Sequence, residues 1–119
     1  MSLQNTPQTL NRVSILATDS VFASTLLLAK DFFHMASLRH AKQQGLGTVP
    51  SFEIRLVSPD GLPTNSFSNV LLPIAGGLDA ADLIILPAFS GDFDALCTKY
   101  PQVTLWLRER HAAGSIICG

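Results

Sequence analysis

Two short apolar segments limit the fold of this chain most strongly. Arg12 to Ala17 (RVSILA) and Leu83 to Leu86 (LIIL) contain β-branched residues, and each is apolar on both of its faces. A strand with this pattern is buried on both sides, which is typical of a parallel sheet covered by helices on both faces. We therefore expect the two segments to be adjacent inner strands of such a sheet.

The sequence between these two strands predicts a helix and a strand that is apolar on one face only. From about Ala23 to Gln44, apolar residues return at spacings of three and four, and Gly45 or Gly47 would end the helix. Ser51 to Ser58 alternates apolar and charged residues, which indicates a strand nearer the sheet edge. The helix residues expected to face the core are Leu27, Ala29, Phe32, Phe33, Ala36 and Leu38.

The remaining segments predict a turn, an excursion, helices and a last strand. Pro59 and Gly61 predict a turn, because Pro fixes φ and Gly accepts a positive φ. Residues 62–78 predict a short excursion or hairpin beside the main sheet. Residues 92–113 predict one or two helices, and Gly114 then turns the chain into the strand SIIC. The helix residues expected to cover the core are Leu105, Trp106 and Leu107.

The order of these elements predicts the fold class. Strands alternate with helices, which is the pattern of an α/β fold with an open parallel sheet and helices on both faces. We expect a single, incomplete domain over residues 12–119, preceded by a disordered leader at residues 1–11. The last strand is apolar on both faces, so we expect it to be packed within the sheet.

Composition and charge limit the partners and the location of the chain. Of 119 residues, 47% are apolar and only 14% are charged, so we expect part of the surface to be covered in a homodimer. A net charge of -1 without a basic patch argues against DNA binding by this chain alone. It has neither a signal-peptide pattern nor about 18 consecutive apolar residues, which predicts a cytoplasmic protein that does not contact membranes. Cys97 and Cys118 form no paired motif and are expected to be reduced thiols.

The candidate binding site follows from the predicted topology. Ligands of open parallel sheets collect beyond the carboxyl ends of the strands, which here are followed by residues 18–24 and 87–92. Phe67, Phe89 and Phe93 lie near these loops and would either line a pocket or pack in the core. The residues predicted to contact a small-molecule ligand are Asp19, Ser24, Ala88, Phe89, Ser90 and Gly91.

Metal and cofactor sites are not predicted. His34, His40 and His111 share no ligand spacing with one another or with Cys97, so they are interpreted as surface or helix-flank residues. The glycine-containing segments GLGTVP and AGGLDAAD match neither a dinucleotide-binding nor a P-loop pattern. We therefore expect no metal and no cofactor.

Three segments in combination carry a resemblance to a known family. RLVSPDG (55–61), ADLIILP (81–87) and WLRERHAAGS (106–115) resemble the ThiJ/PfpI family of the class I glutamine amidotransferase-like superfamily. The resemblance extends over residues 12–119 and is closest to the version of this domain at the amino terminus of AraC-type transcriptional regulators. It implies the same α/β fold, and it implies that DNA is bound only by a separate carboxyl-terminal helix-turn-helix domain.

The resemblance also implies where enzyme chemistry would lie. In the family's enzymes a cysteine sits on a strained turn after the last strand, and this elbow would come about two residues after Gly119. Cys118 could itself be the nucleophile, but we favour a packed strand residue because its spacing from Gly114 is short.

Two features of the family's enzymes are missing from the sequence. The position of their helix-start glutamate is matched by Ser24, which cannot tune a thiol. Asp19 could substitute for that glutamate, but we favour a helix N-cap for it. The family's glycine pair after the third strand is replaced by Ala88 and Phe89, where the enzymes keep room for an oxyanion.

Two functional hypotheses follow from the resemblance. In the first, the chain is a ligand-sensing or dimerisation domain of an AraC-type regulator, with no catalytic residue of its own. In the second, the protein is a ThiJ/PfpI-type cysteine hydrolase, amidase or chaperone-like enzyme whose nucleophile lies beyond residue 119. The missing glutamate and the altered glycine pair favour the first hypothesis.

Overall fold

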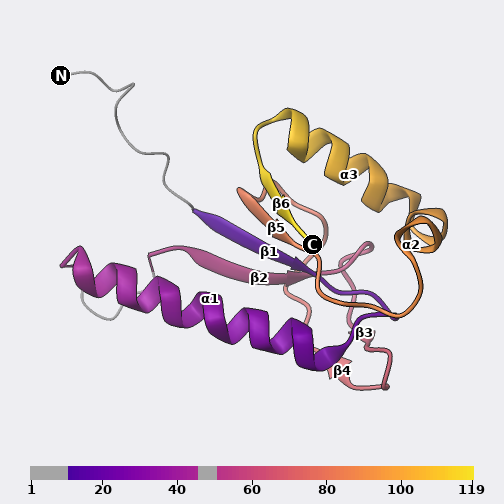
Figure 1. Cartoon of the computed structure of the whole chain (residues 1–119), viewed down its shortest axis with the longest axis horizontal. Helices are drawn as coiled ribbons and strands as arrows, with labels where there is room; N and C mark the ends of the chain where they lie inside the picture. The colour runs from indigo at the N-terminus through magenta and orange to yellow at the C-terminus, as the bar shows by residue number, and fades with distance from the viewer. Residues whose placement is uncertain (1–10, 46–50) are drawn as a thin grey trace.

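A computed structural model describes residues 11–45 and 51–119 of the chain (Figure 1). The predicted leader therefore lies outside the described residues apart from Asn11, and Gly47 does as well. The elements, in chain order, are β1 (Arg12–Leu16), α1 (Ala23–Gln43), β2 (Glu53–Val57), β3 (Thr64–Asn65), β4 (Leu71–Leu72), β5 (Leu83–Ile85), α2 (Phe93–Lys99), α3 (Pro101–Ala112) and β6 (Ile116–Cys118).

The main sheet has four parallel strands in the order β2-β1-β5-β6. The predicted inner strands β1 and β5 are adjacent, with Val13 opposite Leu83, and β2 lies at one edge as expected. β3 and β4 form a separate antiparallel pair, which confirms the predicted hairpin beside the sheet. The predicted Pro59–Gly61 turn is also present, with Gly61 at φ 77°. The α/β fold with an open parallel sheet is thus confirmed.

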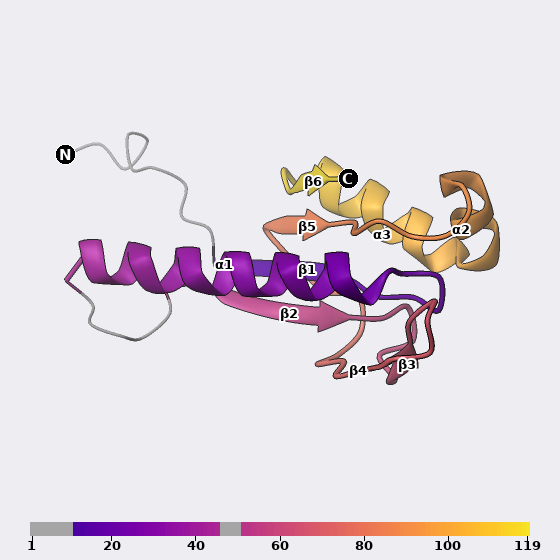
Figure 2. The same ribbon diagram turned by 60° about the horizontal axis from the view of Figure 1, so that its bottom comes forward.

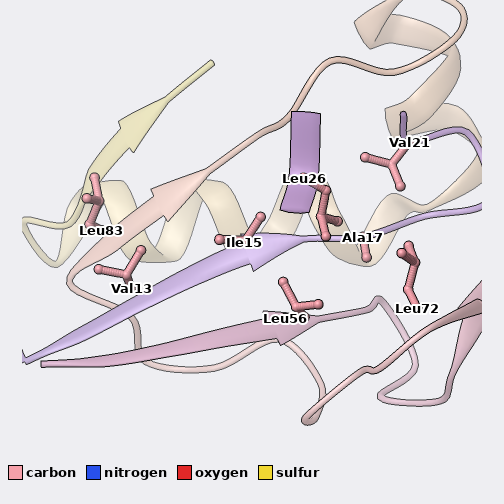
Figure 3. Close-up of a cluster of buried hydrophobic side chains, with 8 residues drawn as sticks. All are labelled: Val13, Ile15, Ala17, Val21, Leu26, Leu56, Leu72 and Leu83. Carbon is pink, nitrogen blue, oxygen red and sulfur yellow. The ribbon is translucent and has the colours of Figure 1, made fainter. Parts of the chain in front are cut away.

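Helices cover both faces of the sheet (Figure 2). α1 lies against one face, and α2 and α3 lie against the other. On the α1 side, Leu26 packs with apolar residues of β1 and β2, which Figure 3 shows gathered around β1. The cluster consists of Val13, Ile15, Ala17, Val21, Leu26, Leu56, Leu72 and Leu83. Because all eight are buried, this layer fixes α1 against the sheet.

The opposite face has an apolar part and a polar part. Its apolar part is a cluster that joins residues of β1, β2 and β5 to residues of α2 and α3: Leu16, Val57, Ala81, Ile84, Leu96, Val103, Trp106 and Leu107. Its polar part includes Ser14 of β1, whose hydroxyl donates a hydrogen bond to the Asp79 carboxylate at 2.7 Å. Ser14 is fully buried in the central strand, so this bond satisfies a polar group that would otherwise be costly.

Asp79 is held by four groups from three separate elements. Its Oδ2 lies 3.1 Å from Nη1 of Arg55 and 3.6 Å from Nη1 of Arg12. The backbone carbonyl of Asp79 accepts a 2.7 Å hydrogen bond from the indole nitrogen of Trp106. These contacts, together with the Ser14 bond, tie β1, β2 and α3 to one loop. We call Ser14, Arg12, Arg55 and Asp79 the polar strut.

The prediction of which α1 residues face the core was partly wrong. Leu27 and Phe32 were expected in the core but are 37% and 63% exposed, whereas the buried residues are Leu26, Ser37 and Ala41. Ser37 is accommodated because its hydroxyl accepts a hydrogen bond from the Phe52 amide and donates one to the Phe52 carbonyl. The core-facing side therefore includes a satisfied polar residue that an apolar pattern misses.

Two other expectations about packing were wrong. Leu105 was expected to cover the core but is 59% exposed, while Trp106 and Leu107 are buried as predicted. β6 was expected to be packed within the sheet, but it is the edge of the described sheet, and both Ile116 and Cys118 are exposed. The physical reason is the same for Leu105 and for β6. The spacing of apolar residues shows which side of a helix or strand is apolar, but it does not show whether another element covers that side.

Asp79→Asn is expected to lower the free energy of unfolding by about 2 kcal/mol, because the guanidinium groups of Arg12 and Arg55 lose the less exposed of the two carboxylates that they share. Urea unfolding of the variant and the wild type measures this difference. Glu109→Gln, at an exposed α3 position that joins no ion pair among the described residues, is the matched control and should change stability by less than about 0.5 kcal/mol. Equal effects of the two substitutions would show that the polar strut contributes no stability.

Candidate functional site

The two predicted site loops lie together at the carboxyl ends of β1 and β5. Val21 and Phe89 form an antiparallel bridge, in which the Phe22 amide donates to the Ala88 carbonyl at 2.9 Å. The Ser90 amide donates to the Ser20 carbonyl at 2.8 Å. The sequence analysis predicted this shared edge from topology alone. The bridge itself was not predicted, and it fastens the loop after β5 to the start of α1.

A groove of about 530 Å³ lies beyond the ends of β5 and β6. Its size falls within the usual range of small-molecule sites, about 300–1,000 Å³. α1 contributes Thr25 and Ala29 to one wall, and Phe89 and Phe93 contribute aromatic rings. The full lining is Thr25, Ala29, Ile85, Leu86, Pro87, Ala88, Phe89, Phe93, Cys118 and Gly119. The groove is therefore mostly apolar, and the Cys118 thiol is the one ionisable side chain in its lining.

Phe89 lines both the groove and a much smaller space beside it. It is half-buried and packs against the cluster under α2 and α3. The space beneath it, between Leu16, Val21 and Leu96, measures only about 10 Å³, too little for any ligand. The sequence analysis expected Ala88 and Phe89 to place bulk where enzymes leave room; Phe89 lines both this small space and the groove, and Ala88 lines the groove.

The predicted site residues divide into two groups. Ala88 and Phe89 line the groove, and so does Phe93. Asp19, Ser24, Ser90 and Gly91 do not line it. Ser90 is bonded to Ser20, and Gly91, at φ 91°, begins the turn into α2. Phe67 is also outside the groove, because its ring packs edge-on against Phe22 with the centroids 5.5 Å apart.

Several lining residues were missed by the sequence analysis. Thr25 and Ala29 are one helical turn apart and line the groove from the same side of α1. Their spacing and small size were a signal that could have found them. Cys118 was assigned to packing, but its exposure at the edge of the sheet places it in the groove.

Asp19 does not cap α1, contrary to the favoured prediction. The N-cap position is Phe22, and no side chain caps this helix end. Asp19 instead forms an ion pair with Lys99 and accepts a 2.9 Å hydrogen bond from the Tyr100 hydroxyl. It therefore joins the β1–α1 loop to the junction of α2 and α3. These partners are 80 and 81 residues away in sequence, so no local pattern could reveal them.

The three groups at this junction shift one another's pKa values. The hydrogen bond from Lys99 lowers the pKa of Asp19, and the Tyr100 hydroxyl adds to this effect while partial burial opposes it. Burial raises the pKa of Tyr100, as does its hydrogen bond to the Asp19 carboxylate. The hydrogen bond to Asp19 raises the pKa of Lys99. These shifts stabilise Asp19 and Lys99 in their charged forms and Tyr100 in its neutral form at neutral pH.

A second cavity of about 450 Å³ lies between α1 and the start of β2. It is lined by Asn11, Lys30, His34, Ser51, Phe52, Glu53 and Ile54. This cavity is at the amino end of its strand, whereas ligands of open parallel sheets bind at the carboxyl ends. We therefore take the groove beyond β5 and β6 as the candidate site.

The described residues include no group of three or more His, Cys, Asp or Glu side chains placed to hold a metal ion. Among the helices of residues 11–45 and 51–119, none is long and apolar enough to cross a membrane.

Comparison with solved structures identifies the fold. A protein assigned as a transcriptional regulator from Vibrio parahaemolyticus superposes with a TM-score of 0.61 at 18% identity, over 90% of this chain and 54% of that one. An AraC family transcriptional regulator from Pseudomonas putida gives 0.58 at 20% identity, over 90% and 62%. A two-domain protein from Anabaena variabilis, with DJ-1/ThiJ/PfpI-like and ferritin-like domains, gives 0.59 at 13% identity, over 90% and 28%.

These similarities establish the fold, which is that of DJ-1/ThiJ/PfpI-like domains, including those of AraC-family transcriptional regulators. The chain spans less than two thirds of the length of each of the three proteins. No protein-family model matches the chain, and no curated protein matches it in sequence.

Asp19→Asn is expected to lower the free energy of unfolding at neutral pH and to lose this effect in acid. The pKa of Asp19 in the folded chain lies below its ordinary value of 3.8. The contribution of its carboxylate is therefore fully present above pH 3.8 and is lost as the pH falls through the lower folded value. Urea unfolding of variant and wild type from about pH 7 to about pH 2 measures the difference.

Lys99→Met is the companion variant, because it removes the charged partner and keeps the alkyl chain. The Asp19→Asn and Lys99→Met effects at neutral pH should not add in the double variant, since both break one ion pair. A difference between Asp19→Asn and wild type that stays constant down to about pH 2 would rule out the charge of Asp19 as its source.

Proposed function

We propose that this chain is a ligand-sensing and dimerisation domain of a cytoplasmic AraC-family transcriptional regulator, without catalytic activity of its own. In this proposal DNA is bound by a separate helix-turn-helix domain. The similarity in fold to a regulator of that family supports the class of protein. The reading frame tests the DNA-binding part directly, since it should continue after Gly119 into a basic helix-turn-helix domain. A frame without such a domain would overturn that part.

The observation that carries the ligand-sensing proposal is the groove beyond β5 and β6. It lies where open parallel sheets bind ligands, it has the volume of a small-molecule site, and its walls are mainly apolar. The Thr25 hydroxyl donates a 2.8 Å hydrogen bond to the Phe22 carbonyl. The lone pairs of the Thr25 oxygen can therefore accept a hydrogen bond from a ligand. The groove thus suits a small, largely apolar molecule with a hydrogen-bond donor.

The lining of the groove argues against acid–base chemistry. A general base must lie within hydrogen-bond reach of the proton that it takes. Apart from the Cys118 thiol, the lining residues carry no ionisable side chain, and Ser24, at the position of the family's glutamate, does not line the groove. Asp19, the alternative carboxylate, is occupied by Lys99 and Tyr100.

One observation favours a variant of the second candidate function, a ThiJ/PfpI-type cysteine hydrolase, amidase or chaperone-like enzyme with Cys118 rather than a later cysteine as its nucleophile. The exposed Cys118 thiol lies in the groove, where a substrate would bind. A thiol without a base beside it is a weak nucleophile, so we rank this function below ligand sensing.

Occupation of the groove should protect Cys118 from alkylation. With anilinonaphthalenesulfonate as an apolar probe, we expect iodoacetamide to modify Cys118 on the order of 10-fold more slowly, as measured by peptide mass spectrometry. Cys97, on α2 and outside the groove lining, should react at an unchanged rate and serves as the internal control. Equal protection of both cysteines, or of neither, would contradict binding in the groove.

Ala88→Trp should abolish this protection, because an indole at an exposed groove position occupies the space of the probe. Ala112→Trp, at an exposed position near the end of α3, is the matched control and should leave the protection intact. Circular dichroism of both variants checks that they fold. Protection that persists in Ala88→Trp would place the probe elsewhere on the protein.

The version of the enzyme alternative in which Cys118 itself is the nucleophile is tested by hydrolysis of p-nitrophenyl acetate. We expect the wild-type chain to turn over this ester no faster than Cys118→Ser, because no base activates the thiol. Multiple turnovers that depend on Cys118 would favour the enzyme and overturn the proposal of a domain without catalytic activity.

A further inference from the structure

Lys30 differs from the other two lysines of this chain in its burial. Lys42 and Lys99 are exposed, whereas Lys30 is half-buried on α1 and lines the second cavity, which lies between α1 and the start of β2. Lysine side chains are mostly exposed, and burial of a lysine is favoured when an opposite charge pairs with it. The question is therefore which carboxylate accompanies Lys30.

The described part of the chain supplies no such carboxylate, since none of its ion pairs includes Lys30. Glu53, the acidic residue in the lining of the cavity, pairs with Nη2 of Arg12 at 3.8 Å and with Nε of Arg55 at 3.5 Å. The residues outside the described ranges include neither Asp nor Glu, so they add no acidic side chain. The positive charge of Lys30 is thus available to a ligand.

Hydrogen bonds hold the two sides of the second cavity together. α1 contributes Lys30 and, one helical turn later, His34, while residues 51–54 contribute the other side. The Ser37 hydroxyl of α1 accepts a 3.0 Å hydrogen bond from the Phe52 amide and donates one of 3.1 Å to the Phe52 carbonyl. Figures 1 and 2 both show β2 running beside α1. A ligand would therefore enter a site whose sides are already fixed.

The hydrogen-bond donors of the lining suit an anion. The Lys30 ammonium group has three donors, and the imidazole of His34 has a ring N–H. The Ser51 hydroxyl adds none, because it donates its proton to the Ser37 carbonyl at 3.1 Å. The cavity thus offers one cation and a neighbouring imidazole to a negatively charged group.

The rest of the lining limits the anion further. Phe52 and Ile54 line the cavity and also pack against the core cluster on the α1 side, so they add apolar surface. The carboxylate of Glu53 lies in the same lining and would repel a doubly charged group such as phosphate more strongly than a single charge. One free cation, apolar walls and a nearby carboxylate together favour a singly charged anion with an apolar body.

We propose that the second cavity binds a small carboxylic acid, with its carboxylate at Lys30 and its apolar body on Phe52 and Ile54. The cavity volume of about 450 Å³ lies within the range of small-molecule sites. Because Glu53 is already paired with two arginines, it is no free partner for an ammonium group, and a plain carboxylic acid fits better than an amino acid. This site is separate from the groove beyond β5 and β6 and does not rest on the proposed function.

An NMR titration with hydrocinnamate tests the ligand class. We expect the backbone amide signals of residues 30–34 and 51–54 to shift. The dissociation constant should be on the order of 10-fold lower than that of hydrocinnamyl alcohol, which lacks the carboxylate. Phenylalanine, which adds an ammonium group to hydrocinnamate, should bind more weakly. Tighter binding of phenylalanine or of inorganic phosphate at these residues would overturn the proposed class.

Lys30→Met tests the role of the cation. It removes the charge and keeps an unbranched side chain, so it should weaken hydrocinnamate binding on the order of 10-fold. Lys30→Arg should keep most of the binding, because a guanidinium group also pairs with a carboxylate. Lys42→Met is the matched control, since Lys42 is exposed on the same helix and does not line the cavity. Its dissociation constant should equal that of the wild type.

Urea unfolding without hydrocinnamate separates lost binding from lost folding. The unfolding midpoint of Lys30→Met should be no lower than that of the wild type, because the substitution breaks no ion pair of the described residues.

Three outcomes would overturn the proposed site. They are the absence of shifts at residues 30–34 and 51–54, an equal loss of binding in Lys30→Met and Lys42→Met, and a loss of binding in Ala88→Trp, which would place hydrocinnamate in the groove. Ligand binding in the groove is tested separately by Cys118 alkylation, so the failure of either proposal leaves the other unaffected.

Discussion

A parallel sheet must be covered on both faces, and the central strand β1 depends on this cover most. Its α1 side is closed by apolar packing around Ile15. Its other side carries Leu16, which packs in the cluster with α2 and α3, and Ser14, a buried hydroxyl that needs a partner. Asp79 supplies that partner and also pairs with Arg12 and Arg55, both of which pair with Glu53 as well. Burial of the central strand is thus completed by charge and hydrogen bonds as well as by apolar area.

The candidate site depends on this central strand through two attachments. The loop after β1 is joined to the loop after β5 by the Val21–Phe89 bridge, and to the α2–α3 junction by Asp19. The bridge fixes the turn at Ala88, and the ion pair holds Lys99 at the end of α2, the helix that begins at Phe93. Two walls of the groove are therefore positioned by contacts that lie outside it.

The sequence predicts the frame of this fold better than its surfaces. Apolar runs on both faces identify β1 and β5, and topology then places their following loops together, as the structure confirms. The core-facing side of α1 was harder to predict, because the outer residue Phe32 is as apolar as the buried Leu26 and both fit a helical period. Asp19 and Cys118 were misassigned because their surroundings come from distant segments of the chain.

The proposed groove and the apolar core share one helix. α1 contributes Thr25 and Ala29 to the groove, and its Leu26 is buried in the cluster against the sheet. A ligand in the groove would therefore contact the same helix that covers the apolar face of β1. Linkage then requires that a ligand bound only by the folded chain raise the free energy of unfolding, by an amount that grows with its concentration relative to its dissociation constant.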